Sequence, residues 1–299
     1  MTPGNRLLYA TMRATSALAC WLPARAALGA GRLFADGLFG VYRLTPYRGF
    51  VEGNIRAALS LAEPEARDLA RLHLRSLVTS IVELMRFPRL RPQDLAQLVT
   101  FQGLEHLEAA RARGRGVIVL TAHFGNWELM GAAIAQLCPL SVLVQPPSKD
   151  AFERLFIEYR AMFGVSTHPN TGPASLRPIL RALGRNEAIA LLSDQHGEAQ
   201  DAFATLFGHP VSVPVGAHFL AERTGAAIVP AFIERLSDDR HVLTFEPELV
   251  CPDAQRFAEA YTAILEARVK ARPDHWLWVH DRWAREGELR PREGAACPA

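Results

Sequence analysis

The chain has 299 residues, of which 49% are hydrophobic and 21% charged, and its formal net charge is +2. These values are ordinary for a globular protein and exclude the disordered and fibrous classes. The near-neutral charge argues against a nucleic-acid-binding protein, which usually carries a basic excess. The cysteines, Cys20, Cys138, Cys251 and Cys297, are far apart in the sequence. This spacing argues against a disulfide framework or a cysteine-based zinc site and suits a reducing compartment.

The first 50 residues combine arginine with leucine and aromatic residues, and Asp36 is the only acid among them. This composition favours helices that lie in the headgroup region of an anionic bilayer. The alternative is a set of amphipathic helices packed on the rest of the protein. The longest uncharged run, 129–148, is interrupted by glutamine and proline, and the apolar run 7–22 is short and broken. Neither run indicates a membrane span.

Helical spacing dominates the first 100 residues, and apolar residues recur at helical intervals over 66–86. Beyond them, short apolar runs alternate with helical segments, which is typical of an α/β fold. The expected strands are 116–121, 140–144, 188–192, 227–233 and 241–246. The expected helices are 126–137, 151–163, 175–183, 215–223 and 253–271. We therefore predict a largely buried mixed sheet with helices on both faces, preceded by an N-terminal helical region that associates with a membrane.

The segment 114–128, GRGVIVLTAHFGNWE, carries the clearest chemistry. A buried strand ends just before His123, which places this residue at the carboxyl edge of the sheet, where open α/β sheets bind ligands. Gly125 permits a tight turn, Asn126 is a good helix N-cap, and Glu128 falls in the first helical turn. His123 and Glu128 are therefore predicted to face each other, so that the carboxylate fixes the imidazole tautomer and raises its basicity.

This pair makes His123 a candidate general base for an alcohol, and free N–H groups at the helix start are candidates for binding an oxyanion. The structural alternative is that His123 and Glu128 simply complement a helix N-terminus. A metal site is not expected, because the zincin pattern needs a second histidine at a fixed spacing. The sequence contains no Gly-x-Ser-x-Gly, so a serine esterase would lack its usual nucleophile context.

The hexapeptide HFGNWE at 123–128 resembles the His-x4-acid motif of the glycerolipid acyltransferase superfamily. Its glutamate form is similar to the branch of the lipid A late acyltransferases, the lauroyl and myristoyl acyltransferases of lipopolysaccharide biosynthesis. The similarity covers residues 95–285 and extends more weakly through the N-terminal helices. Further blocks follow in the order of that family. They are YRAMFG at 159–164, LLSDQ at 191–195, LFGHP at 206–210, GAAIVP at 225–230 and DHWLWVHDRW at 274–283.

The resemblance implies an O-acyltransferase that moves a fatty acyl group from an acyl thioester to a hydroxyl of a glycolipid. The donor would be acyl carrier protein or acyl-CoA, and no metal or other cofactor is expected. His123 would be the general base and Glu128 its orienting acid. Arg160 would contact a substrate phosphate or phosphopantetheine, since an arginine fork matches phosphate geometry. The other expected substrate contacts are Gly125, Asn126, Asp194 and Gln195.

We expect the chain to divide into an N-terminal membrane-associating region at 1–95, an acyltransferase domain at 96–290 and a flexible tail at 291–299. The expected location is the cytoplasmic face of the inner membrane, with the membrane surface as a partner. The chain departs from the family pattern at 148–150, at Leu206 and in the loop 196–200. The alternatives are a lysophospholipid acyltransferase of the 1-acylglycerol-phosphate type, a thioesterase and a non-catalytic lipid-binding protein at the membrane surface.

The last family block contains three tryptophans, Trp276, Trp278 and Trp283. We expect them to pack in the core as part of a terminal helix. The alternative is an interfacial aromatic belt.

Overall fold

The computed structural model describes residues 2–42, 44–45, 47–145, 150–170, 172, 175–195, 202–280 and 282–283. The family departures at 148–149 and 196–200 and the tail expected at 291–299 lie outside these residues.

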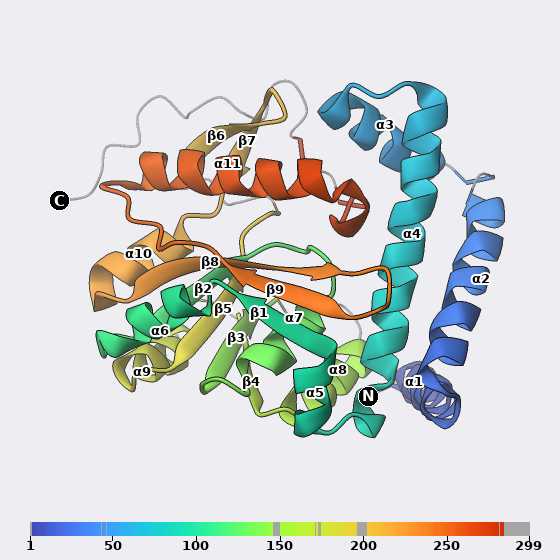
Figure 1. Ribbon diagram of the computed structural model, residues 1–299, viewed down its shortest axis with the longest axis horizontal. Helices are drawn as coiled ribbons and strands as arrows, with labels where there is room; N and C mark the ends of the chain where they lie inside the picture. Colours follow the sequence, from blue (N-terminus) through green and yellow to red (C-terminus); the bar gives the residue numbers. More distant parts are fainter. Residues whose placement is uncertain are drawn as a thin grey trace.

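Helices occupy most of the first 98 residues, as the spacing predicted. They are α1 Pro3–Trp21, α2 Ala24–Tyr42, α3 Tyr47–Leu59, α4 Glu63–Met85, a 3₁₀ turn Phe87–Arg89 and α5 Pro92–Leu98. Helix α4 begins where the Glu65 carboxylate accepts a hydrogen bond from the Ala62 N–H at 3.0 Å, with Pro64 in its first turn. It stands between the outer helix α2 and the body of the protein, and α3 packs on α4 and on the body (Figure 1).

Seven of the described strands form one sheet in the order β1-β9-β8-β2-β5-β3-β4. They are β1 Val99–Gln102, β2 Val117–Thr121, β3 Leu140–Val144, β4 Val165–Pro169, β5 Ala188–Leu192, β8 Ala227–Arg235 and β9 His241–Phe245. Neighbours from β8 to β4 run parallel, whereas β9 is antiparallel to β8 and β1 is parallel to β9. The sheet is therefore mixed, as predicted.

Both faces of the sheet are covered by helices, and the alternation of side chains along β2 divides the core accordingly. Ile118 and Leu120 pack with α9, α10 and α11, while Val117 and Val119 pack with α6, α7 and α8. These helices are α6 Leu104–Ala112, α7 Trp127–Ile134, α8 Asp150–Ala161, α9 Leu176–Gly184, α10 Gly216–Thr224 and α11 Ala254–Ala271. This double coverage explains why β2 is a continuous apolar run.

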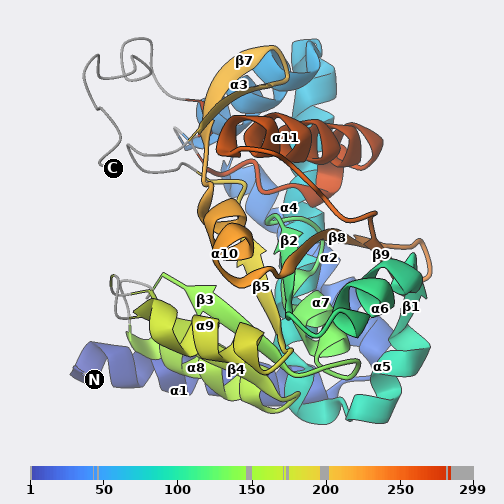
Figure 2. The same ribbon diagram turned by 90° about the vertical axis from the view of Figure 1, so that its left-hand side faces the viewer.

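A separate antiparallel hairpin is absent from the expected strands. It consists of β6 Ala202–Leu206 and β7 His209–Val213 and packs against α11 (Figures 1 and 2). Phe207 and Gly208 join the strands with φ angles of 53° and 79°. Positive φ at both central residues is the signature of a tight two-residue hairpin turn. The Phe-Gly pair of the family block is thus a hairpin turn, and Leu206 is a fully buried core residue.

The tryptophans pack in the core, as expected, but not on a helix. Trp276 and Trp278 are buried, and Trp283 stacks against Trp278 with ring centroids 6.5 Å apart. Helix α11 ends at Ala271, and a 3₁₀ turn at Pro273–His275 leads into extended chain. The extended conformation is fixed because Trp276 forms a β-bridge with Phe124. The predicted terminal helix is therefore wrong.

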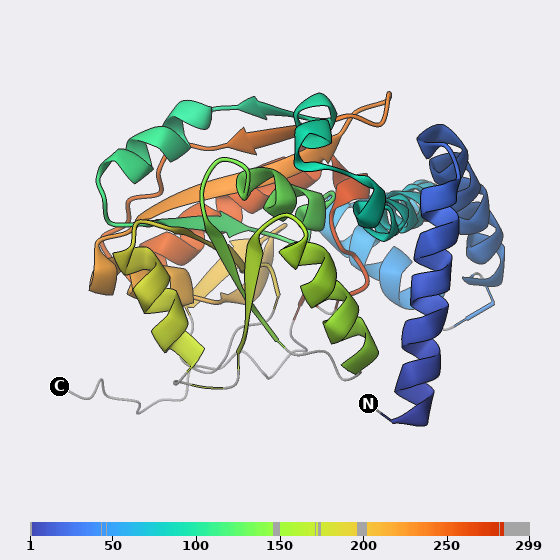
Figure 3. The ribbon, with the colours of Figure 1, turned by 90° about the horizontal axis from the view of Figure 1, so that it is seen from below.

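Helices α1 and α2 lie on the outside of the molecule, with α1 beside α8 (Figure 3). None of the helices in the described part of the chain combines the length and the hydropathy that crossing a membrane requires. Both helices nevertheless expose large apolar side chains. They are Leu7, Leu18, Trp21, Leu33, Phe34, Leu38 and Val41. The membrane association of this region stays a prediction.

Candidate active site

The side chains of His123 and Asp194 meet because of the register between two parallel strands. Strand β2 pairs with β5 so that Thr121 lies opposite Leu192. His123 and Asp194 each follow two residues later, so both emerge at the same carboxyl edge of the sheet. The Nδ1 atom of His123 lies 2.9 Å from Oδ1 of Asp194. This edge is the candidate active site.

Asp194 is held on both of its carboxylate oxygens. Oδ1 bonds His123, and Oδ2 accepts a hydrogen bond from the Trp276 indole at 3.0 Å. Both Asp194 and Trp276 are buried. A carboxylate at Nδ1 selects the tautomer in which Nδ1 carries the proton, and Nε2 then has a free lone pair. The geometry therefore makes Nε2 of His123 the basic atom.

The pKa of His123 is raised above its ordinary value of 6.5. Burial favours the neutral ring, since only 22% of the side chain is exposed, but the charge and hydrogen bond of Asp194 outweigh it. The charge of Glu128 adds to the increase. Burial likewise opposes ionisation of Asp194, yet the pairing with His123 and the Trp276 hydrogen bond lower its pKa. Together these shifts favour an imidazolium beside a carboxylate.

Glu128 makes a different contact from the one predicted. Its carboxylate is bound by the Arg160 guanidinium through two hydrogen bonds, from Nε at 2.8 Å and from Nη2 at 2.6 Å. The hydrogen bond expected between Glu128 and His123 is made by Asp194 instead. The reason is that Glu128 sits in the first turn of α7, where it meets the last turn of α8, which carries Arg160. Glu128 acts on His123 through its charge.

Gly125 forms the tight turn that the sequence predicted. Its φ is +60°, and a Cβ there would lie 2.0 Å from the carbonyl oxygen of Ile233, so only glycine fits. The Gly125 N–H donates to the His275 carbonyl at 2.9 Å, and the Leu277 N–H donates to the His123 carbonyl at 3.0 Å. The turn is therefore bonded to the segment 275–277, and the Gly125 N–H, expected to face substrate, is occupied within the protein.

Asn126 is the N-cap of α7, as predicted, because its Oδ1 accepts from the Leu129 N–H at 3.0 Å. Its Nδ2 donates to Oε2 of Glu83 at 2.6 Å, and the residue is 3% exposed. Both ends of the carboxamide are thus bonded inside the protein, which differs from the expected substrate contact. The sequence reasoning missed Glu83. The feature of the sequence that could have identified Glu83 is that it is the single acid in the otherwise uncharged run 76–85 of α4.

Gln195 follows Asp194 at the same edge and is half-buried. Its expected contact with substrate, like that of Arg160, stays a prediction.

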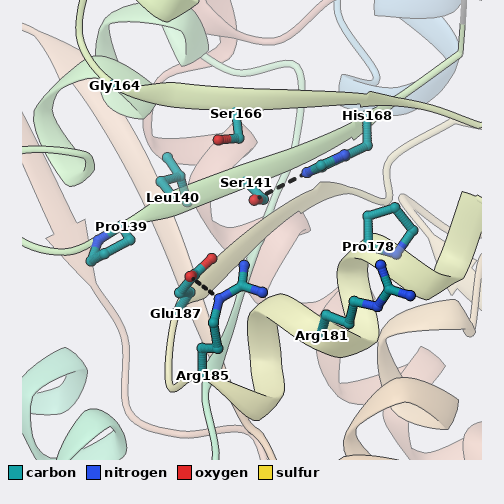
Figure 4. Close-up of a pocket in the computed structure, with 10 residues that line it drawn as sticks. All are labelled: Pro139, Leu140, Ser141, Gly164, Ser166, His168, Pro178, Arg181, Arg185 and Glu187. Carbon is teal, nitrogen blue, oxygen red and sulfur yellow. Dashed lines mark hydrogen bonds and ion pairs between the residues drawn. The ribbon is translucent and has the colours of Figure 1, made fainter.

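A separate cavity of about 320 Å³ lies between α9 and strands β3 and β4 (Figure 4). Figure 4 shows Arg181 and Arg185 of the α9 segment on one side of it, with Ser141 and His168 of the two strands on the other. Its lining includes Leu140, at the start of β3, whereas His123 follows the end of β2. It is not part of the His123 site.

Comparison with known proteins found a family match over most of the chain. A family model described as bacterial lipid A biosynthesis acyltransferase matches residues 21–285. That range contains His123, Glu128, Arg160 and Asp194, with the elements that position them.

Individual relatives carry related names. The phosphatidylinositol mannoside acyltransferase of Mycobacterium tuberculosis (strain ATCC 25618 / H37Rv) is 27% identical over 227 residues, 70% of each chain. The lipid A biosynthesis palmitoleoyltransferase of Escherichia coli (strain K12) is 28% identical over 187 residues, 61% of this chain and 60% of the relative. The lipid A biosynthesis lauroyltransferase of the same organism is 24% identical over 187 residues, 60% of each chain. The resemblance drawn from HFGNWE and the later blocks is thereby confirmed: the chain is an acyltransferase that belongs to the bacterial lipid A biosynthesis acyltransferase family.

Proposed function

We propose that this enzyme transfers a fatty acyl group from an acyl thioester to a hydroxyl of a glycolipid, with His123 as the general base. The observation that carries the proposal is the His123–Asp194 pair, which leaves Nε2 as a free base at the carboxyl edge of the sheet. The relatives are named for a phosphatidylinositol mannoside and for lipid A. A glycolipid acceptor is the class that these names share.

In the proposed reaction, Nε2 of His123 removes the proton from the acceptor hydroxyl as its oxygen attacks the thioester carbonyl. The C–O ester bond forms, the C–S bond breaks, and the imidazolium returns its proton to the departing thiolate. Asp194 stabilises the imidazolium and keeps the ring in place, and Trp276 fixes Asp194 in turn. The donor is acyl carrier protein or acyl-CoA, both of which present such a thioester.

The oxyanion that forms on the thioester carbonyl needs hydrogen-bond donors close to His123. The Gly125 N–H already donates to His275, so we assign this role to the start of α7. The N–H groups of Trp127 and Glu128 lie in its first turn, where a helix has no internal acceptors. The Trp127 ring also packs edge-on against His123, with centroids 5.1 Å apart.

The Arg160 guanidinium binds Glu128 with two of its three nitrogens, and we propose that the third contacts substrate. The bonds to Glu128 use Nε and Nη2. We assign the remaining Nη1 to the phosphate of the donor's phosphopantetheine arm. The bonds from Nε and Nη2 hold the Glu128 carboxylate in place, and its charge favours the His123 imidazolium.

We place the enzyme on the cytoplasmic face of the inner membrane, held by α1 and α2. Seven large apolar side chains are exposed on these two helices, and burying each in the bilayer boundary is favourable. The arginines interspersed among them suit anionic headgroups.

Thiol release from acyl carrier protein and acyl-CoA thioesters tests the proposal. The assay is run with and without a total lipid extract, for the wild type, for His123→Ala and for His106→Ala, a control histidine on α6 outside the site. We expect release that needs lipid, is lost in His123→Ala and is retained in His106→Ala. Release without lipid would indicate a thioesterase, and full activity of His123→Ala would refute the base.

A further inference from the structure

We propose that Glu83 is a positioning residue for acyl transfer, because its buried carboxylate orients the Asn126 carboxamide and so fixes the turn that carries His123. The inference rests on the proposed function of His123. Glu83 belongs to α4, in the N-terminal helical region, and lies 43 residues before Asn126 in the sequence. It contacts neither His123 nor Asp194 in the described structure, and it acts through other residues.

The Glu83 side chain is 11% exposed and is held by charged and polar neighbours. Arg235 donates to both of its oxygens, to Oε2 at 2.7 Å and through a second bond to Oε1. His241 lies 3.5 Å away, and Asn126 donates at 2.6 Å. Burial alone would raise the pKa of Glu83, but His241 and Arg235 lower it to about 2. The group is therefore a fixed carboxylate, able only to accept hydrogen bonds.

This acceptor decides which way the Asn126 amide points. With Nδ2 toward Glu83, Oδ1 faces the Leu129 N–H and caps α7. The flipped amide would set oxygen against a carboxylate and nitrogen against an N–H, so both contacts would be repulsive. Glu83 therefore selects the capping orientation, and α7 begins directly after the catalytic turn.

A second connection from Glu83 reaches the same turn from its other side. Arg235, which is paired with Glu83, donates its backbone N–H to Nε2 of His275 at 3.0 Å. The His275 carbonyl accepts the Gly125 N–H at 2.9 Å. The turn that places His123 is thus bonded to Glu83 through Asn126 and through Arg235 and His275. Because a small displacement of a catalytic group costs rate more than binding, the expected effect falls on kcat.

A polarity swap tests the inference. In Glu83→Gln, the new amide places a donor against either Asn126 or Arg235. In Asn126→Asp, two carboxylates face each other. The double variant restores one hydrogen bond with reversed polarity, since the glutamine amide donates to the aspartate, which still caps Leu129. Each single variant is expected to lower kcat about 10- to 100-fold with KM for the donor unchanged, and the double variant to recover most of the loss.

Two further measurements separate positioning from general stability. Ser80→Ala removes another partner of Arg235, which donates to the Ser80 hydroxyl at 3.1 Å, and it should leave kcat at the wild-type value. Amide hydrogen exchange over residues 123–129 should rise in each single variant and return in the double variant. This second readout does not depend on turnover, so it separates failure of this inference from failure of the proposed function. Wild-type kcat in the folded single variants, or no recovery of exchange and rate in the double variant, would overturn the role of Glu83.

Discussion

At the scale of single residues, the hydrogen bond from His123 to Asp194 determines which imidazole nitrogen is available to substrate. The sequence identified His123 at the carboxyl edge and named Asp194 as an expected substrate contact, but it assigned the orienting role to Glu128. Glu128 is the nearer carboxylate in the sequence. The strand register between β2 and β5, a tertiary property, brings Asp194 to Nδ1, while Arg160 binds Glu128. Local spacing could not reveal either pairing.

The pH dependence of turnover follows from this pairing. His123 acts as a base only when neutral, so kcat/KM of the wild type should rise with pH through a pKa above 6.5. Asp194→Asn removes the negative charge that favours the imidazolium, while the burial of His123 remains, so the pKa of His123 falls. The rise of kcat/KM with pH, the acid limb of the profile, then moves to lower pH. The maximal rate should drop about 10²- to 10⁴-fold.

Glu128→Gln is the matched control for that pH profile. It removes a smaller, purely electrostatic contribution to the His123 pKa, so its acid limb should move less than that of Asp194→Asn. Initial rates measured across pH for both variants check the difference. A larger shift in Glu128→Gln would restore Glu128 as the orienting acid.

At the scale of elements, the sequence predicted the strands that are apolar and covered on both faces. The bounds expected for β3 and β5, 140–144 and 188–192, agree with the structure. It missed β4, because this edge strand carries Ser166, Thr167 and His168 and has no apolar run. The β6–β7 hairpin, with two strands of five residues, was also missed. Edge and hairpin strands are specified by their partners more than by their own composition.

The turn between β2 and α7 gives a prediction about backbone conformation. Gly125→Ala combines a positive φ with a clash against the Ile233 carbonyl, and it should cost more than about 3 kcal/mol of unfolding free energy. Gly164→Ala is the matched control, since Gly164 has φ +82° and no atom close to the added Cβ. It should cost about 1–2 kcal/mol. Urea unfolding measures both, and equal losses would show that the Ile233 contact has no effect.

At the scale of the whole molecule, the N-terminal helices are connected to the active-site elements. Tyr159 of α8 donates to the Ser16 hydroxyl of α1 at 2.6 Å, and Tyr9 of α1 donates to Glu158 of α8 at 2.6 Å. The next residue of α8, Arg160, binds Glu128. Helix α1, which we assign to the membrane surface, is therefore hydrogen-bonded to α8, the helix that carries Arg160. The sequence predicted an amphipathic block there, but not this attachment.

Membrane association can be separated from catalysis by surface substitutions. Leu33→Asp combined with Phe34→Asp places charge on exposed positions of α2, and binding to anionic vesicles should weaken at least about tenfold. Val250→Asp changes an equally exposed apolar residue outside the N-terminal helices and should bind vesicles like the wild type. Vesicle co-sedimentation gives the comparison. Unchanged binding of the α2 variant would remove α2 from the membrane surface, while transfer to a detergent-solubilised acceptor should persist in every variant.

The central claim is transfer of an acyl chain to a glycolipid hydroxyl by His123, and the fate of the acyl group tests it most directly. An isotopically labelled acyl thioester is incubated with total lipid extract and either wild-type enzyme or His123→Ala, and the lipids are analysed by mass spectrometry. We predict one labelled acyl chain in ester linkage on a glycolipid with the wild type and none with His123→Ala. Label recovered as free fatty acid, or only on a phospholipid formed from a lysophospholipid, would contradict the account.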